Sequence, residues 1–179
     1  MIQAFSKRFV ICLLKRLAGQ LALSLALAVV LIMFGFEPVR VEGYSMLPRL
    51  QNNERLFVDK AAFWFEPIRR GDVVVFHYPR DLRQNFIKRV IGMPGDTVVI
   101  WGGTVFVNGQ KLVEGYVPRG FQDYSDYQEV KVPPGAYYVL GDHRNSSNDS
   151  RFWGCLPAGD IFGRAVFAYW PVADLGLVH

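Results

Sequence analysis

The most prominent feature of the hydropathy pattern is an apolar run near the N-terminus. Residues 17–36 contain no charged side chain. A helix rises about 1.5 Å per residue, so a helix of this length spans roughly 30 Å, the thickness of the bilayer core. The run therefore predicts a transmembrane helix. Two alternatives stay open, a buried helix of a soluble protein and a cleaved signal peptide, whose apolar core is usually about 7–15 residues long.

A different pattern begins at residue 54, where short apolar runs rich in β-branched and aromatic residues alternate with turns such as "RRGD" and "MPGD". In "TVFVNGQKLVEG", Asn108-Gly109 predicts a type I′ hairpin turn. "DKAAFWF" predicts at most a short helix, and the polar stretch 115–129 predicts a long excursion. We therefore expect a mostly β fold, an antiparallel barrel or sandwich-like domain. The expected strands lie in "RLFVDK", "DVVVFHY", "NFIKRVIG", "DTVVIWG", "TVFVNG", "EVKV", "AYYVLG" and "GRAVFAYW".

The charges around the apolar run predict its orientation. Basic residues precede it, whereas the residues that follow it closely have mixed charge, and cations near a span favour the cytoplasmic side. We expect a cytoplasmic leader at 1–16, a single span at 17–36, and an external catalytic domain at 37–179, on the periplasmic or outer side of the cell membrane. The residues concerned are Lys7, Arg8, Lys15 and Arg16 before the span, and Glu37, Arg40 and Glu42 after it.

The remaining composition excludes several classes of function. The net charge of +4 is modest and forms no basic stripe, so we expect no nucleic-acid partner. The two cysteines, Cys12 and Cys155, would lie on opposite sides of the membrane, and Cys155 reads as a small buried apolar residue. No His, Cys or carboxylate cluster has metal-site spacing, so we expect neither a metal nor a cofactor. We expect the protein to act as a monomer.

Ser45 and Lys88 are the candidates for chemistry. A serine hydroxyl needs a base, and lysine is a known alternative to histidine. Lysine can serve as a base only when it is neutral, which requires an apolar pocket that lowers its pKa. Lys88 would share one face of a strand with Phe86 and Val90. Taken alone, these residues leave open a turn serine and a lysine that extends its amine to solvent.

Four blocks carry a resemblance to a known family: "SMLPRL", "RRGDVVVF", "KRVIGMPGD" and "GDHRNSSNDSRFWG". In this order they resemble the membrane-bound type I signal peptidases, and "GRAVFAYWP" is also similar. The resemblance covers roughly residues 41–171. It implies a serine endopeptidase that removes signal peptides from exported preproteins, with Ser45 as nucleophile and Lys88 as general base.

The resemblance also implies supporting roles. Ser147 would orient the lysine amine by a hydrogen bond. Asp149 and Arg151 would support the active-site loop, through a salt bridge involving Arg89, and Asp142 would be structural. The backbone N–H of Ser45 would bind the oxyanion.

The sequence departs from the family pattern at four positions. Gly43 stands where some members carry a hydroxyl for the oxyanion, which leaves the second donor open. Arg49 replaces a threonine, so packing beside the nucleophile is in question. His143 and Ser146 each stand where asparagine is usual. None of these changes removes a proposed catalytic atom.

Cleavage after small residues, of the Ala-x-Ala type, implies shallow pockets and an extended peptide that pairs with a strand edge. The expected edges are the strand that enters Lys88, with Phe86 and Ile87, and one that enters Ser45, residues 41–44. Val41 and Met46 would line the pocket. Exposed aromatics at 64 and 65 could contact the bilayer, although a core position for both is favoured.

Three other functions compete with this interpretation. A specialised peptidase of the same fold could act on one substrate. A catalytically inactive, membrane-tethered β-domain could serve binding or assembly, but intact Ser45, Lys88 and Ser147 argue against it. A soluble, self-cleaving repressor-type protein is disfavoured by the apolar run.

Overall fold

The structure is a computed structural model that describes residues 2–178, except for the side chains of residues 2–12, 31–34 and 64. The expected Trp64 contact and the side chain of Cys12 lie outside the described residues. The chain divides into two compact units, residues 1–36 and 37–179.

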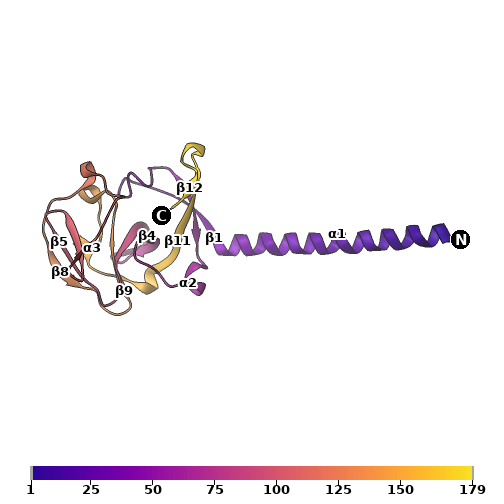
Figure 1. Ribbon diagram of the computed structural model, residues 1–179, viewed down its shortest axis with the longest axis horizontal. Helices are drawn as coiled ribbons and strands as arrows, with labels where there is room; N and C mark the ends of the chain where they lie inside the picture. The colour runs from indigo at the N-terminus through magenta and orange to yellow at the C-terminus, as the bar shows by residue number, and fades with distance from the viewer. Residues whose placement is uncertain (1, 179) are drawn as a thin grey trace. The chain divides into compact units, whose positions relative to one another are not determined.

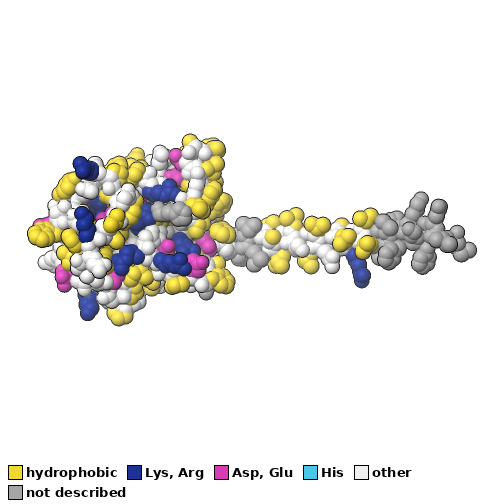
Figure 2. Space-filling model, viewed as in Figure 1, with side chains coloured by type: hydrophobic (Ala, Val, Ile, Leu, Met, Phe, Trp, Pro, Cys, Tyr) yellow, Lys and Arg dark blue, Asp and Glu magenta, His cyan; other side chains and the backbone are white. Residues whose placement is uncertain are grey.

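The first unit is one uninterrupted helix, α1 (Ile2–Gly35; Figure 1). It begins at Ile2, so the helix runs through most of the stretch that we expected as a separate leader. All described side chains from Leu13 to Val30 are exposed, and hydrophobic atoms line this part of the helix in Figure 2. The same window is long and apolar enough to cross a membrane, which is consistent with the predicted transmembrane helix.

The second unit is built mainly from antiparallel strands. Its helical elements are short: α2 (Ala62–Phe65), α3 (Ser150–Trp153) and the 3-10 turns η1 (Arg119–Phe121), η2 (Arg144–Ser146), η3 (Ala158–Asp160) and η4 (Val172–Asp174). The strands are β1 (Phe36–Arg40), β2 (Arg55–Asp59), β3 (Val73–Tyr78), β4 (Asp81–Gly92), β5 (Thr97–Trp101), β6 (Thr104–Val107), β7 (Gln110–Lys111), β8 (Tyr127–Lys131), β9 (Ala136–Leu140), β10 (Leu156–Pro157), β11 (Ile161–Trp170) and β12 (Gly176–Leu177).

These strands form two sheets. The larger has the order β1-β2-β11-β3-β4-β9-β10, with β12 paired to β11, and the smaller has the order β7-β6-β5-β8. The described strand pairings are antiparallel. The larger sheet is open between β1 and β10, so the confirmed mostly β fold is sandwich-like and not a closed barrel.

The uninterrupted apolar run in β3 reflects burial on both faces of the larger sheet. Val73 and Val75 pack with Leu50, Leu56 and neighbours on one face, while Val74 and Phe76 pack into a second cluster on the other. A strand with only one buried face would alternate apolar and polar residues. β3 is therefore a central strand, and its pairing with β4 fixes the position of the residues that β4 carries.

The smaller sheet contributes a third core cluster around Val98, Val105 and Tyr138. Its β6–β7 hairpin pairs Val107 with Gln110 across Asn108-Gly109. Both turn residues have positive φ, 52° and 77°, as the predicted type I′ turn requires. Cys155 is a free, partly buried thiol that packs against this cluster, and burial raises its pKa.

Candidate active site

Ser45 lies in the turn between β1 and β2. Gly43 has φ +99°, a backbone conformation that favours glycine, and its N–H donates to Asn52 Oδ1 at 2.9 Å. The turn continues until the N–H of Leu50 donates to Met46 O at 2.9 Å. The expected strand at 41–44 is therefore wrong: β1 ends at Arg40, because the chain bends at Gly43 to present Ser45.

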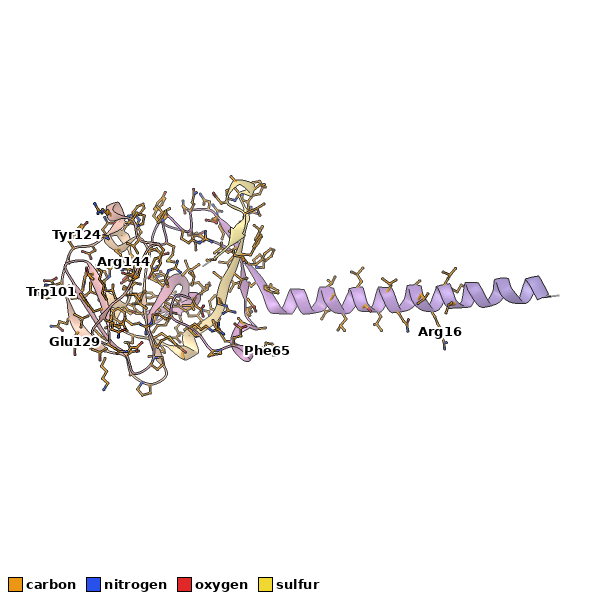
Figure 3. All side chains as sticks on the ribbon, viewed as in Figure 1. Arg16, Phe65, Trp101, Tyr124, Glu129 and Arg144 are labelled. Carbon is orange, nitrogen blue, oxygen red and sulfur yellow. The ribbon has the colours of Figure 1, made fainter. Side chains whose placement is uncertain are left out.

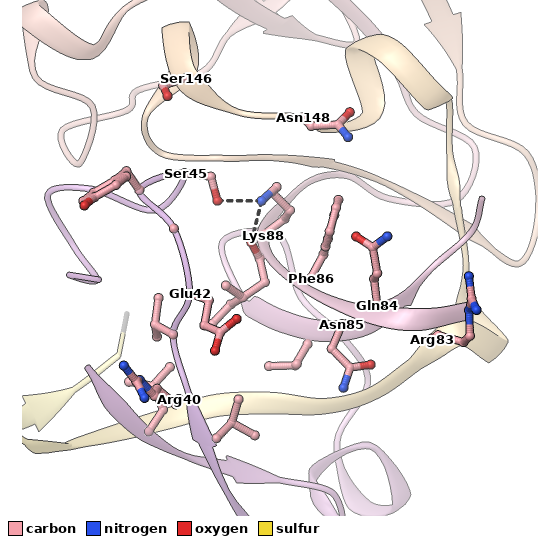
Figure 4. Close-up of a pocket in the computed structure, with 17 residues that line it drawn as sticks. Arg40, Glu42, Ser45, Arg83, Gln84, Asn85, Phe86, Lys88, Ser146 and Asn148 are labelled. Atoms are coloured by element: carbon pink, nitrogen blue, oxygen red, sulfur yellow. Dashed lines mark hydrogen bonds between the residues drawn. The ribbon is translucent and has the colours of Figure 1, made fainter. Parts of the chain in front are cut away.

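Lys88 lies on β4 and reaches this turn from the neighbouring part of the sheet. Its Nζ lies 2.7 Å from Ser45 Oγ and donates to Ile87 O at 3.0 Å (Figure 4). The residue is only 4% exposed, and Nζ lies 5.2 Å from the centre of the Phe86 ring. The structure thus joins two residues that are 43 positions apart in the sequence.

Burial lowers the pKa of Lys88 from 10.5 to about 8. The nearby carboxylates of Asp149 and Asp142 oppose this shift, and the guanidinium of Arg151 reinforces it. Desolvation is the largest cause because it penalises the charged ammonium. A substantial share of the amine is therefore neutral near pH 8 and able to accept a proton.

Ser147 lies close to the turn that carries Ser45, and the contacts of the described residues include no hydrogen bond between its side chain and Lys88. Its Oγ is buried without a hydrogen-bond partner, while Lys88 Nζ contacts Ser45 Oγ and Ile87 O. Gly141 permits the close approach, because a Cβ there would lie 2.2 Å from Ser147 Oγ and 2.5 Å from Ser45 O. The role of Ser147 in orienting the lysine amine therefore stays a prediction.

Two buried ion pairs support the loop that carries Ser147. Arg89 pairs with Asp142 through contacts of 2.9 and 2.6 Å, with both side chains almost fully buried. Arg151 pairs with Asp149, which also accepts the N–H of Gly141 at 3.0 Å. The ion pair found for Arg89 is therefore with Asp142, and Asp149 pairs with its sequence neighbour.

A segment that we call the strap, residues 113–126, contacts the same loop. Glu114 forms a nearly buried ion pair with Arg144, and Asp123 contacts Arg151 at 2.8 Å. Sequence analysis missed these contacts. The sequence predicted only a polar excursion at 115–129, and no local signal connects Glu114 or Asp123 to arginines about 30 residues away.

A groove of about 690 Å³ opens beside the Ser45–Lys88 pair (Figure 4). Val41, Phe86 and Ile87 line it as expected. Met46 does not, and we correct that expectation: it is 1% exposed and packs in the core with Val41 and Leu50, because the turn directs it inward. The lining also includes Val39, Arg40, Glu42, Gly43, Tyr44, Leu56, Val75, Arg83, Gln84, Asn85, Ser146 and Asn148, most of which the sequence did not indicate.

Among the described strands, none pairs with one edge of β4 along this groove. Its residues from Asp81 to Arg89 pair with β3 on one side, but β9 pairs on the other side only from Arg89 to Gly92. The stretch at Arg83–Ile87 therefore offers backbone groups to an added strand.

The unusual residues near the nucleophile have definite contacts. Arg49, whose effect on packing was in question, donates to Leu177 O in β12. The ring Nδ1 of His143 lies 3.0 Å from Tyr44 O. Among the residues that the structure describes, no three or more His, Cys, Asp or Glu side chains gather as metal ligands would.

A serine hydroxyl next to a buried lysine amine of lowered pKa, at the end of a groove with a free strand edge, has the form of a Ser–Lys peptidase site. A family model described as signal peptidase, peptidase S26, matches residues 14–170. The chain belongs to this signal peptidase family, which confirms the resemblance drawn from the sequence blocks.

Individual relatives agree with this assignment. A signal peptidase I of Leptolyngbya laminosa is 47% identical over 165 residues, which cover 87% of this chain and 79% of the relative. Signal peptidase I T of Bacillus subtilis is 37% identical over 164 residues, 87% of this chain and 84% of the relative. A crystal structure of a signal peptidase I from Enterococcus faecalis is 32% identical with a TM-score of 0.50, covering 55% of this chain and 97% of that one.

Proposed function

We propose that Ser45 and Lys88 carry out the cleavage of signal peptides that characterises this family of serine endopeptidases. The observation that carries the proposal is the 2.7 Å contact between Ser45 Oγ and an amine whose pKa burial lowers to about 8. A hydroxyl so placed can lose its proton to the amine as it attacks a carbonyl.

The chemistry follows from this contact. Neutral Lys88 takes the hydroxyl proton while Ser45 Oγ forms a bond to the scissile carbonyl carbon. The resulting ammonium then gives its proton to the leaving amine as the peptide bond breaks, which leaves an acyl ester on Ser45. Water, deprotonated by the same amine, then attacks the ester carbonyl carbon. The ammonium returns the proton to Ser45 Oγ as the ester bond breaks, which releases the carboxylate product and restores the free serine. The backbone N–H of Ser45 donates to the oxyanion, and Gly43 adds no side-chain donor.

The proposed part of Ser147 is to complete the hydrogen bonds of the neutral lysine. A neutral amine has two N–H donors and one lone pair. When Ser45 donates to the lone pair and Ile87 O accepts one N–H, one N–H remains for Ser147 Oγ, which is buried and without a partner. We propose that this bond forms during turnover and holds the neutral amine toward Ser45.

The groove suits an extended peptide. The free edge of β4 supplies backbone hydrogen bonds, and Val41, Phe86 and Ile87 supply an apolar wall near the nucleophile. Residues of the Ala-x-Ala type fit shallow pockets of this kind. We propose exported preproteins as the substrates and a monomer as the active form.

The membrane placement is part of the proposal. The basic residues before the apolar stretch of α1 favour a cytoplasmic N-terminus and an external catalytic unit in the cell membrane. Phe65, for which a core position was favoured, is 84% exposed and projects from α2 (Figure 3). Exposed aromatic side chains are common at membrane surfaces, which supports a lipid contact at Phe65.

The test is cleavage of a panel of preproteins by the detergent-solubilised protein. Ser45→Ala and Lys88→Ala should each abolish cleavage while circular dichroism and melting temperature show an intact fold. Lys131→Ala is the matched control, because this lysine is exposed on β8. Full activity in either site variant would exclude the pair. Cleavage of one preprotein alone would favour the specialised peptidase.

A further inference from the structure

His143 holds two successive carbonyl groups of the turn that carries Ser45. Its backbone N–H donates to Ser45 O at 3.0 Å, and its ring Nδ1 lies 3.0 Å from Tyr44 O. A carbonyl oxygen only accepts hydrogen bonds, so Nδ1 carries the proton in this contact.

The ring contact acts on the peptide group that we propose as the oxyanion donor. The carbonyl of Tyr44 and the N–H of Ser45 belong to one planar group, and this peptide bond is not among the cis bonds of the chain. In a trans peptide the two point in opposite directions, so fixing the carbonyl also fixes the N–H. A hydrogen bond to the carbonyl oxygen further polarises the group and strengthens its N–H as a donor.

We propose that His143 is a positioning residue for the oxyanion donor of Ser45, acting through the Tyr44–Ser45 peptide group. The inference rests on the proposed role of Ser45. Gly43 contributes no side-chain hydroxyl, so the backbone N–H of Ser45 carries a larger share of the stabilisation of the intermediate, and its orientation becomes more important.

The strap also contacts the ring of His143. Phe121 in η1 packs against it edge to face, with ring centres 4.3 Å apart and an angle of 71°. The neighbouring Gly120 accepts a hydrogen bond from Asn145 at 3.2 Å, which ties η1 to the loop that carries the histidine. The ring therefore lies between an aromatic support and a carbonyl, and its direction is set from both.

The test compares three variants in preprotein cleavage. His143→Ala keeps the backbone N–H and removes the ring donor together with its contact to Phe121, so we expect kcat to fall about tenfold with KM nearly unchanged. His143→Asn restores an amide donor at a similar distance from the backbone and should recover most of kcat. Phe121→Leu keeps apolar bulk without the edge-to-face contact and should lower kcat by a smaller factor.

A second measurement separates positioning from general support of the fold. A peptide aldehyde forms a tetrahedral adduct with Ser45 and places an oxygen in the oxyanion position. Its affinity should fall by about the same factor as kcat across the variants. The affinity for an uncleavable peptide, such as one with proline after the cut, should stay within about twofold because it makes no oxyanion.

Specific results would overturn the inference. It is wrong if His143→Ala cleaves at the wild-type rate, if it changes only KM, or if the asparagine variant is as slow as the alanine variant at equal thermal stability. These results leave the proposed function intact as long as Ser45→Ala is inactive. An active Ser45→Ala protein would instead refute the proposed function itself.

Discussion

At the scale of single residues, Lys88 meets two opposing demands. The apolar surroundings that lower its pKa to about 8 make it a competent base, and they also make the folded protein bury an ammonium group at neutral pH. Its partners are a hydroxyl and a carbonyl, neither of which carries a compensating charge. Activity and stability should therefore respond to pH through the same group.

The first consequence is a pH dependence of cleavage. The base must be neutral, and with a pKa of about 8 only about one tenth of Lys88 is neutral at pH 7. We expect kcat/KM to rise about tenfold per pH unit below pH 8 and to level off above it. The measurement is a pH profile with a peptide that has no titrating group near the cut. If kcat/KM instead keeps rising until about pH 10.5, the pKa of Lys88 is not lowered.

The second consequence concerns stability. The folded pKa of Lys88 is lowered, so the unfolded chain binds more protons between pH 8 and 10.5, and wild-type stability rises with pH across that window. Lys88→Met removes this term. We expect the unfolding free energy of the variant, relative to wild type, to fall by about 2 kcal/mol from pH 6.5 to pH 9.5. Chemical unfolding in detergent at both pH values measures this free energy. If the variant and wild type differ by the same amount at pH 6.5 and pH 9.5, the pKa of Lys88 is not lowered by folding.

Residues also show how far the sequence could predict the site. Lys88 was singled out because a lysine among Phe86, Ile87 and Val90 breaks the apolar pattern of a strand, and its role as base was added by the family resemblance. Met46 was misplaced because the direction of a side chain in an irregular turn depends on hydrogen bonds such as Leu50 N–H to Met46 O. The buried, unpartnered hydroxyl of Ser147 depends on the packing of its loop against Gly141, which no sequence pattern encodes.

At the scale of elements, the regular strands were predictable and their irregular connections were not. β3, β5, β6 and β9 follow the β-branched and aromatic runs closely, because propensity and burial agree there. The expected strand at 41–44 failed at Gly43, where positive φ and the Asn52 side chain redirect the chain. The contacts of the strap were missed for another reason, because they join residues that are far apart in the sequence.

Gly141 is a glycine at which an added side chain would disturb the active site directly. It follows β9, and a Cβ there would lie 2.5 Å from Ser45 O and 2.6 Å from Ser147 Cβ. Gly141→Ala must therefore displace the nucleophile turn or the supporting loop. We expect at least a hundredfold loss of kcat/KM, because displacements of about 1 Å at a catalytic group cost this much.

Gly92→Ala is the matched control for this substitution. A Cβ at Gly92 would lie 2.7 Å from Val98 and 2.9 Å from both Val132 and Tyr138, which crowds the core of the smaller sheet. It should cost about 1–3 kcal/mol of stability and leave kcat/KM of the folded protein within about twofold. Peptide cleavage and chemical unfolding of both variants give the comparison. Equal activity losses would mean that overpacking acts through the fold as a whole.

At the scale of the whole molecule, the two units carry separate tasks. Ser45, Lys88, the groove and the strap all lie within residues 37–179. The apolar window Leu13–Val30 belongs to the other unit. We therefore expect α1 to act as a tether that raises the local concentration of enzyme at the membrane, where preproteins emerge, without contributing to the chemistry.

Two variants test this division of tasks. In the first, residues 17–36 are replaced by an unrelated apolar helix of the same length, and the second comprises residues 37–179 alone. Tethering often raises the effective concentration by a factor of about 100 or more. The isolated unit 37–179 should therefore cleave a preprotein in lipid vesicles about 100-fold more slowly than the full chain, and it should cleave a short soluble peptide at the normal rate. The first should match the full chain on both substrates. If the variant with the replaced helix does not cleave the vesicle-bound preprotein, the sequence of α1 itself contacts the substrate. If the isolated unit cleaves that preprotein at the full rate, α1 does not act as a tether.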